Sequence, residues 1–527
     1  MGDAVSRDLN IHGLAAAFKT ATDAGKSAMI ARLEQPITDT IELEKRQAHL
    51  KTIRAKLKES GTREKVASAR KILTETESAL ISVGSIRSTE KDDRLSEYYS
   101  QILWHPTSMV APLNANSFAN ETMVAFRTLF LPGMAVIMPL LLLLAPILVF
   151  WYVLKQPLTF NGYFTLLSQS IKKAMPSMLG KARFTGRGGV MELGEQFVHM
   201  AVSAGVFIAS IWNQVSSAIT MRTAVADMRS RAAAVRAFTE ATRDLGAAIG
   251  CPTALPDWPL GDLGLFGAAW NTPALILQIH TAAGELDMLS AIALQTRTCY
   301  PKAGDTLTIR DLYHPGTGAK RIYNSLSMGL DGSRNHVLLT GPNRGGKSTM
   351  LKSLGAAVLM AQTLGVVFAR SATLPIFSDI ITALAPADSL GKMSLFESEI
   401  EFAKDVQARL AVPGRGPMFL MMDEIFHGTN AHDGVEASQV FLDDLYGAHG
   451  SGVFSVVSTH YMELPARYSK KAQALCMEAT QNPDDPDSLT YTYRLTAGVN
   501  RFSSVREILR ERGLLRPVSP KIVGASE

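Results

Sequence analysis

Cysteine is scarce in this chain of 527 residues, which has only Cys251, Cys299 and Cys476. The three are far apart and form no CxxC pair or Cys/His cluster, so no zinc site is expected and a reducing compartment is favoured. We also expect no cleaved signal peptide, because the first thirty residues lack a basic segment followed by an apolar core. A strong charge of one sign is missing as well, since the formal net charge is only +5. Composition therefore predicts no particular polyanion as a partner.

The length indicates about three structural units rather than one. Residues 14–100 have a helical pattern, in which Leu43, Leu50 and Leu57 recur at helical spacing between charges of both signs. Such interleaved charge is typical of the solvated face of packed helices and not of a DNA-binding patch.

Residues 128–154 contain no charged side chain. At about 1.5 Å per residue, a helix of this length crosses a hydrocarbon core of about 30 Å. Membrane helices tolerate prolines such as Pro132, Pro139 and Pro146, and Trp151 suits the membrane interface. We therefore predict a transmembrane helix, with a buried core helix as the alternative.

A second charge-free run, residues 196–221, is more polar and contains His199 and several serines. Within it, Ala201, Gly205 and Ala209 form a ridge of small residues at which another membrane helix can approach closely. Together the two runs predict a transmembrane hairpin that returns the chain to its starting side.

Arginine recurs every seven residues after the second run, and so lies along one side of a predicted helix. The four residues are Arg222, Arg229, Arg236 and Arg243. A solvated face is the preferred interpretation, followed by contact with lipid headgroups and then with nucleic acid.

The stretch HVLLTGPNRGGKSTMLKSLGAAVLMA predicts an apolar strand, a glycine-rich turn and a helix, and it satisfies the pattern G-x-x-x-x-G-K-[ST]. In this pattern, backbone N–H groups and the positive end of the helix cradle phosphates. Lys347 would neutralise the β and γ oxygens, and Ser348 would ligate Mg²⁺. The residues predicted to bind ATP are Gly341, Pro342, Asn343, Arg344, Gly345, Gly346, Lys347, Ser348 and Thr349.

A second apolar strand, in MFLMMDEIFHGTN, ends at Asp423 and Glu424. Beside a phosphate loop, Asp423 would join Ser348 in holding Mg²⁺, and Glu424 would polarise the attacking water. A third strand, in GVFSVVSTHYMEL, ends at His460, where ATPases of the ABC type have a histidine that contacts the γ-phosphate. The catalytic candidates are therefore Glu424 and His460, against the alternatives of a surface acidic pair and a structural histidine.

These motifs, in the order GPNRGGKST, SLFESEI, DEIFHGTNAHDG and STHYMEL, resemble the ATPase domain of the MutS mismatch-repair family over residues 306–510. The resemblance implies that Asn343 orients the nucleotide phosphates. It also implies that Ser394 and Glu399 belong to a signature that one subunit presents to its partner's ATP. A homodimer with two composite ATP sites is therefore expected.

The chain also departs from the family pattern. We expect no amino-terminal domain of the kind that reads mismatches, because the core-like helices begin near residue 30. The hydrophobic hairpin is expected where the family inserts its DNA clamp. The usual adenine-stacking aromatic aligns with Arg321, so the base is expected to rest on Arg321 or Tyr323. Phe426 and His427 replace the usual small and basic pair after the catalytic glutamate.

We therefore expect an α/β P-loop NTPase domain of the ABC type, similar to MutS domain V, preceded by an all-α core and lever region with a transmembrane hairpin. The expected segments are a helical core-like region (1–127), the hairpin with its loop (128–221), a helical lever (222–305), the ATPase domain (306–510) and a tail (511–527). The expected function is that of a multi-pass membrane ATPase, dimeric and cytoplasm-facing, which uses ATP and Mg²⁺ to move a lever attached to the lipid bilayer. The alternatives are an ATP-dependent DNA repair or recombination protein, for which DNA binding is possible but not favoured, and a scaffold whose ATP cycle sets its dimeric state.

Overall fold

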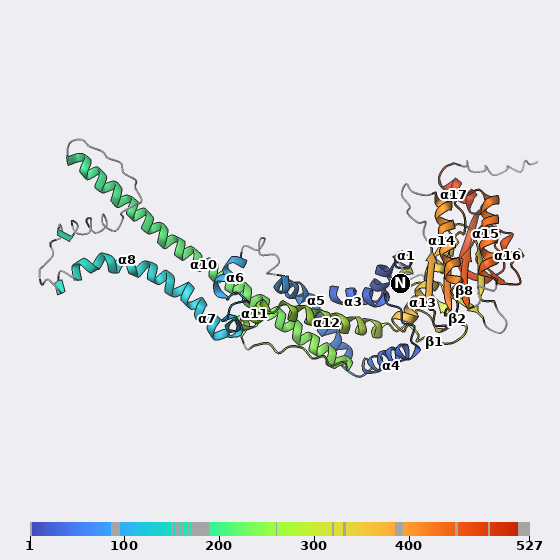
Figure 1. Cartoon of the computed structure of the whole chain (residues 1–527), viewed down its shortest axis with the longest axis horizontal. Coiled ribbons are helices and arrows are strands. Elements are labelled where there is room, and N and C mark those ends of the chain that lie inside the picture. The colour runs from blue at the N-terminus through green and yellow to red at the C-terminus, as the bar shows by residue number, and fades with distance from the viewer. Residues whose placement is uncertain are drawn as a thin grey trace, which may run out of the picture. The chain divides into compact units, whose positions relative to one another are not determined.

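The computed structural model describes residues 3–85, 95–148, 189–259, 261–318, 321–329, 334–384, 394–447, 452–482 and 485–514, with a few positions between 151 and 169 (Figure 1). The chain forms two compact units. The first comprises Met1–Lys71, Thr242–Thr253 and Thr281–Glu527, and the second comprises Ile72–Ala241 and Ala254–His280. These units do not coincide with the five segments expected from the sequence, because the amino-terminal helices belong to the same unit as the carboxy-terminal sheet.

A six-stranded sheet forms the centre of the first unit, in the order β10-β9-β4-β8-β7-β6. Its strands are β4 (His336–Thr340), β6 (Asp379–Ala383), β7 (Met418–Met422), β8 (Val453–Ser458), β9 (Ala472–Asn482) and β10 (Asp485–Ala497). Neighbouring strands run parallel except for β9 and β10, which pair antiparallel. Strands β4, β7 and β8 are buried along their whole length, which explains their nearly continuous apolar sequences.

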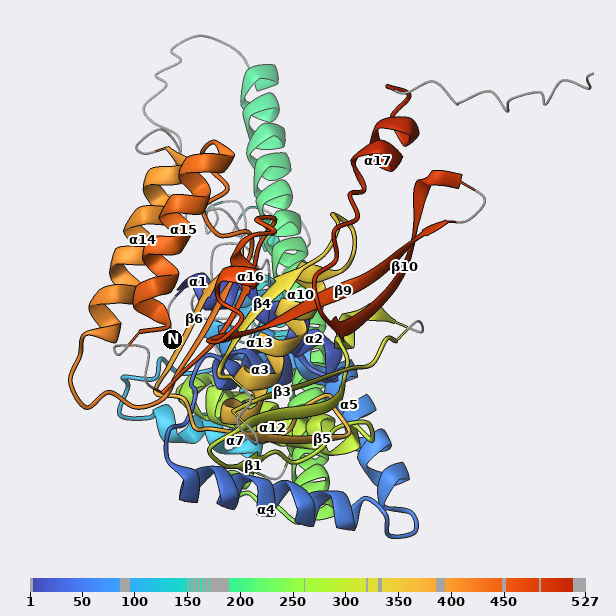
Figure 2. The same ribbon diagram turned by 90° about the vertical axis from the view of Figure 1, so that its right-hand side faces the viewer.

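Helices cover both faces of this sheet. On one face, α13 (Lys347–Thr363) packs in a cluster with Val337, Leu339 and Met421. On the other, α14 (Leu395–Leu410) and α15 (Ala431–Leu445) pack with the alternate residues Leu338 and Leu420 (Figure 2). The period of two along each strand thus divides the apolar side chains between two cores. Two short helices complete this region, α16 (Leu464–Arg467) and α17 (Val505–Glu511).

A smaller sheet of four strands, in the order β1-β5-β2-β3, adds its apolar face to the same core as α13. Its strands are β1 (Lys302–Ala303), β2 (Leu307–Leu312), β3 (Asn324–Met328) and β5 (Ser371–Leu374). Strand β2 pairs antiparallel with both β3 and β5.

Four amino-terminal helices pack into the first unit. They are α1 (Asp3–Asp8), α2 (Ile11–Ala17), α3 (Asp23–Leu33) and α4 (Thr40–Lys56). Leu9, Leu14 and Phe18 are at most 2% exposed and belong to the same cluster as α13. A Cβ added to Gly355 in α13 would lie 2.7 Å from Leu9 Cδ2, so the two segments are in close contact. This part of the chain therefore completes the core beneath the glycine-rich loop.

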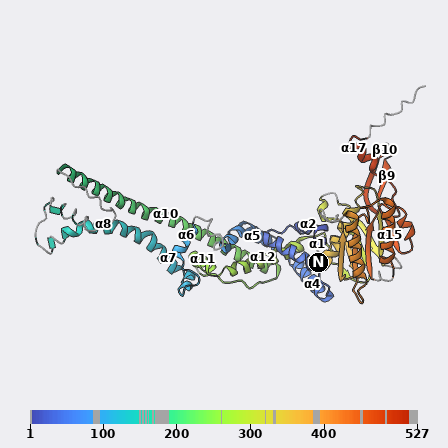
Figure 3. The ribbon, with the colours of Figure 1, turned by 45° about the horizontal axis from the view of Figure 1, so that its top comes forward.

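The second unit is helical in all its described parts (Figure 3). Its elements are α6 (Ser96–Ile102), η1 (Ala111–Ala115), α7 (Ser117–Ala125), η2 (Phe126–Phe130), α8 (Leu131–Leu148) and α11 (Asp262–Asn271). Helices α5 (Thr62–Ser85), α10 (Gly189–Ile249) and α12 (Pro273–Leu294) contribute residues to both units.

Helix α10 changes its surroundings near residue 217. From Ala218 onward, buried residues recur every three or four positions, as in a helix that packs along one side. The first of them are Ala218, Met221, Ala224, Val225, Met228 and Ala232. Between residues 205 and 216, by contrast, every side chain is exposed except the half-buried Ile211. Packing thus begins within the last four residues of the charge-free run 196–221.

The arginines of this helix occupy a solvated face, as preferred from the sequence. Arg222, Arg229 and Arg243 are exposed, and Arg229 forms an ion pair of 2.7 Å with Glu121 in α7. Arg236 donates to the carbonyl of Pro259 at 3.1 Å.

One helical stretch in the described parts of the chain, Ser117–Met138, is long and apolar enough to cross a membrane. The mean hydropathy is 1.3, and 6% of its 18-residue apolar window is buried. Core helices of soluble proteins pass the same test, so the two-span hairpin remains a sequence prediction. Residues 149, 150, 153 and 154 of the first predicted span, and the tail after residue 514, lie outside the described residues.

Candidate nucleotide site

The glycine-rich loop, residues 341–346, joins the buried strand β4 to the start of α13. Gly341 has φ 150° and Gly346 has φ 95°, conformations that a side chain would strain. Gly346 caps α13, so the positive end of the helix opens at the loop. Backbone N–H groups at such a helix start form a site for phosphate oxygens.

Lys347 lies in the first turn of α13 and is 5% exposed. Its Nζ donates to the carbonyl of Gly341 at 2.9 Å and lies 3.9 Å from Glu424 Oε1. Burial lowers the pKa of the Lys347 ammonium, and the nearby carboxylates oppose that change. The ammonium is therefore held beneath the loop, within reach of any phosphate that the loop binds.

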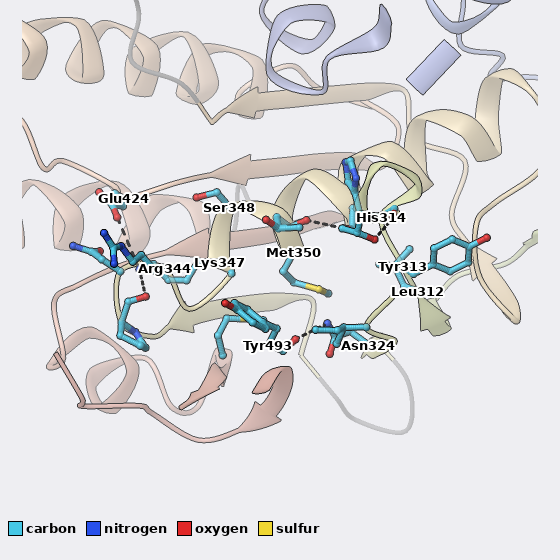
Figure 4. A pocket seen from close by; sticks show the side chains of 18 residues that line it. Leu312, Tyr313, His314, Asn324, Arg344, Lys347, Ser348, Met350, Glu424 and Tyr493 are labelled. Carbon is cyan, nitrogen blue, oxygen red and sulfur yellow. Dashed lines mark hydrogen bonds and ion pairs between the residues drawn. The ribbon is translucent and has the colours of Figure 1, made fainter. Parts of the chain in front are cut away.

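A cavity of about 500 Å³ opens above the loop (Figure 4). Loop residues from Pro342 onward form one wall, with Glu424 at one end and Tyr313 and His314 at the other. Tyr493 of β10 also lines the cavity. The volume lies within the range of about 300–1,000 Å³ that is usual for small-molecule sites.

Arg321 and Tyr323, which were expected to support the adenine ring of ATP, do not line this cavity. Arg321 lies over the ring of Tyr313 at 5.2 Å, and Tyr323 meets the same ring edge-on at 5.6 Å. Tyr493 and His314 occupy the cavity wall instead. Burial and the neighbouring Lys352 lower the pKa of His314, which favours its neutral ring.

Tyr493 was missed from the sequence because no short motif marks it. It has φ 56°, its ring stacks on Tyr491 at 6.0 Å, and its carbonyl accepts from Asn324 Nδ2 at 3.2 Å. Its Cδ1 would lie 3.1 Å from a Cβ at Gly346. Pairing of β10 with β9 brings it to the loop, and the only sequence signal is the alternation in YTYR.

Two predicted metal ligands lie together. Ser348 Oγ, from α13, donates to Asp423 Oδ2 at 2.5 Å, and Asp423 also accepts from the Ser458 hydroxyl. No group of three His, Cys, Asp or Glu side chains that could hold a metal occurs within the described ranges. A hydroxyl and one carboxylate nevertheless fit Mg²⁺, which binds hard oxygens and takes most of its other ligands from water and phosphate.

The two catalytic candidates, Glu424 and His460, also lie together. His460 Nε2 and Glu424 Oε1 are 2.6 Å apart, and the Glu424 amide donates to Ser458 Oγ at 2.8 Å. The hydrogen bond from His460 lowers the pKa of Glu424, although burial opposes this effect. The carboxylate is thus ionised at neutral pH and lines the cavity next to the loop, where it can accept a proton from water.

The two signature residues lie in different settings. Ser394 caps α14 and forms a capping box, in which its hydroxyl accepts from the Glu397 amide at 3.2 Å. The Ser394 amide and hydroxyl donate in turn to Glu397 Oε2 at 2.8 and 3.0 Å, and these two hydrogen bonds lower the pKa of Glu397. Glu399 lies one turn further along and accepts from the Gly428 amide of its own chain at 3.2 Å. Neither Ser394 nor Glu399 lines the cavity above the loop.

The family model for MutS domain V matches residues 337–513, which contain the loop, Asp423, Glu424 and His460. The DNA mismatch repair protein MutS of Shouchella clausii is 38% identical over 200 residues, which are 36% of this chain and 22% of that protein. MutS of Thermus aquaticus is 33% identical over 240 residues, 44% of this chain and 28% of that protein.

The endonuclease MutS2 of Streptococcus suis is 30% identical over 238 residues, 44% of this chain and 29% of that protein. The chain therefore spans about a quarter of the length of these relatives. Residues 337–513 of this chain are therefore similar to MutS domain V, an ATPase-type α/β domain.

Proposed function

We propose that the chain binds and hydrolyses ATP in the cavity above the glycine-rich loop. The single observation that supports this most is the meeting of three groups at the loop. They are the buried Lys347, the Ser348–Asp423 pair at 2.5 Å and the Glu424–His460 pair at 2.6 Å.

In this proposal, loop amides and Lys347 hold the phosphates, and Tyr493 packs against the base. Ser348 and Asp423 would hold Mg²⁺, which supplies positive charge to the β and γ oxygens. Glu424 accepts a proton from the attacking water, and His460 fixes the direction of the Glu424 carboxylate.

We further propose that the second unit anchors the protein in a lipid bilayer. Val206 is 54% exposed, Phe207 37% and Ile208 65%. Because successive helix residues point about 100° apart, these three apolar side chains face different directions and cannot all pack on one neighbour. Trp212, 70% exposed, lies one turn further along. Lipid can contact apolar side chains on all sides of a helix. The exposed apolar side chains therefore support the proposal that residues 128–154 and 196–221 form a transmembrane hairpin.

The multi-pass topology, with the ATP site on the cytoplasmic side, is part of this proposal, because ATP is supplied there. The bilayer would then take the place that DNA takes in relatives, and ATP turnover would move the helices joined to the membrane.

A homodimer through the first unit is also proposed. Ser394 lies at the start of α14 with an exposed side chain, where a second copy can present it to ATP. An ATP-loaded Glu424→Gln variant should then change from monomer to dimer in sedimentation, and Ser394→Arg should block the change. A protein that remains monomeric at saturating ATP would exclude composite sites.

Repair or recombination of DNA is the second candidate, and the printed names of the relatives favour it. Against it, the similarity is confined to the part of the chain around domain V and covers about a quarter of each relative.

The two candidates make opposite predictions for the full chain. A membrane anchor resists carbonate extraction and, in nanodiscs, binds mismatched and matched duplexes equally weakly at physiological salt. Extraction into the soluble fraction, with tight binding that prefers a mismatch, would instead establish the DNA function.

A further inference from the structure

We infer that Glu399 and His427 act together as positioning residues for Glu424 and connect it to helix α14. The inference rests on the proposed ATP hydrolysis, in which Glu424 accepts the proton from water. It assigns Glu399 a role within its own subunit, in addition to any role toward a partner.

The turn that carries Glu424, residues 423–428, has an unfavourable backbone. Glu424 has φ 57° and Phe426 has φ 51°, both in the left-handed region that side chains other than glycine rarely adopt. Phe426 is 2% exposed, so its ring is also fixed in the core. Two such residues in one short turn persist only when surrounding contacts hold them there.

Contacts from the sheet side hold one half of the turn. The Glu424 amide donates to Ser458 Oγ at 2.8 Å, and Tyr461 Oη donates to the Phe426 carbonyl at 2.7 Å. Ser458 ends strand β8 and Tyr461 follows it closely, so both contacts tie the turn to the rigid sheet.

Contacts from α14 hold the other half. Glu399 Oε2 accepts from the Gly428 amide at 3.2 Å, and Glu399 Oε1 lies 2.9 Å from His427 Nδ1. The same Nδ1 lies 2.8 Å from the Glu424 carbonyl oxygen. Because both neighbours of Nδ1 are acceptors, Nδ1 carries the hydrogen and shares it between them.

Glu399 and His427 therefore connect α14 to the backbone of Glu424 through a chain of hydrogen bonds. Glu399 is 15% exposed at its side chain and lies on the helix that Ser394 begins. A displacement of that helix, as expected when a partner engages Ser394, pulls on His427 and on the Glu424 carbonyl. Neither Glu399 nor His427 lines the nucleotide cavity, so this path affects turnover and not nucleotide affinity.

The test measures kcat and KM for ATP in the full chain, together with the affinity for a fluorescent ATP analogue. His427→Ala and Glu399→Gln should each lower kcat about tenfold or more, because a small misplacement of a catalytic group is costly. KM and analogue affinity should stay within about twofold, since the cavity is unchanged.

His427→Asn is the conservative variant, because the asparagine amide nitrogen can replace Nδ1 as a donor. It should restore kcat to within about threefold of the unsubstituted protein. Glu401→Gln is the matched control on the same helix, where Glu401 pairs only with Lys404 among the ion pairs of the described residues, at 2.7 Å. Glu401→Gln should leave kcat and KM unchanged.

The inference is overturned if His427→Ala and Glu399→Gln keep kcat within twofold. It is also overturned if nucleotide affinity falls as much as kcat, or if His427→Asn is as slow as His427→Ala. Absence of ATP turnover in the unsubstituted chain would instead overturn the proposed hydrolysis, and this inference with it.

Discussion

Helix α13 in the first unit and the amino-terminal part of α10 in the second are both rich in apolar residues, but their surroundings differ. In α13, Leu351, Leu354 and Val358 are fully buried between the sheets and the amino-terminal helices. In α10, Val206, Ile208 and Trp212 are more than half exposed. Apolar content alone therefore does not determine burial. Burial depends on whether another segment covers the apolar side chains. Between residues 205 and 216 of α10, no described protein segment covers them.

The largest expected effect comes from charging the exposed part of α10. Replacing both Val206 and Ile208 by Arg should release the full chain from membranes, because each arginine in the middle of a membrane helix costs about 3 kcal/mol. Carbonate extraction measures the release. Ala226→Arg, at an exposed position in the packed half of the same helix, is the control and should stay in the membrane fraction. Equal extraction of both variants would contradict the lipid assignment.

Glu424→Gln should largely abolish ATP hydrolysis by the first unit without affecting the membrane association proposed for the second unit. We expect ATP turnover to fall about 10²- to 10⁴-fold, because the amide cannot accept the proton from water. ATP binding should remain, whereas Lys347→Ala should weaken it. Phosphate release and equilibrium binding measure these changes, and membrane association should be unaltered. Unchanged turnover would remove Glu424 from the role of base.

Shortening one apolar side chain in α13 and one in α10 tests directly whether the two helices differ in packing. Leu354→Ala in α13 should lower the free energy of unfolding by about 2–5 kcal/mol, because it leaves a cavity in a packed core. Val206→Ala should change it little, since no described protein neighbour packs against that side chain. Thermal or denaturant unfolding in the same detergent measures both. Similar losses in the two variants would show that α10 is packed in solution.

The first unit should also lose stability at mildly acidic pH. Burial lowers the pKa of His336 to about 4, whereas an unfolded histidine titrates near 6.5. The unfolded chain therefore binds an additional proton between these values, and stability falls as the pH falls through this window. At pH 5 the loss relative to pH 7 should be about 2 kcal/mol. His336→Asn should reduce the slope of unfolding free energy against pH, and an unchanged slope would exclude His336 as its source.

The placement of the candidate site residues was predictable because it is encoded locally. The spacing of Gly341, Gly346 and Lys347 fixes a loop between a buried strand and a helix, and the acidic pair follows directly after another buried strand. Periodicity along the strands likewise predicts their burial, because helices cover both faces of the sheet.

What the sequence did not reveal depends on contacts between distant segments. Tyr493 lines the cavity above the loop, and only the β9–β10 pairing brings it near the loop. Glu399 was assigned from the family resemblance to a partner's ATP, and its contact with the Gly428 amide is a tertiary contact. Likewise, the helical pattern of the amino-terminal region does not specify that Leu9 and Phe18 pack beside α13.

The position of Leu9 against Gly355 has a consequence for biosynthesis. The first helices leave the ribosome more than three hundred residues before the helix that they pack against. Their apolar residues must therefore remain unpaired while the intervening chain is made, and contacts of such long sequence separation form slowly. A shortened gene that starts at residue 306 would encode the loop and the catalytic turn but would leave the face of α13 uncovered. The core beneath the glycine-rich loop is therefore built from both ends of the chain.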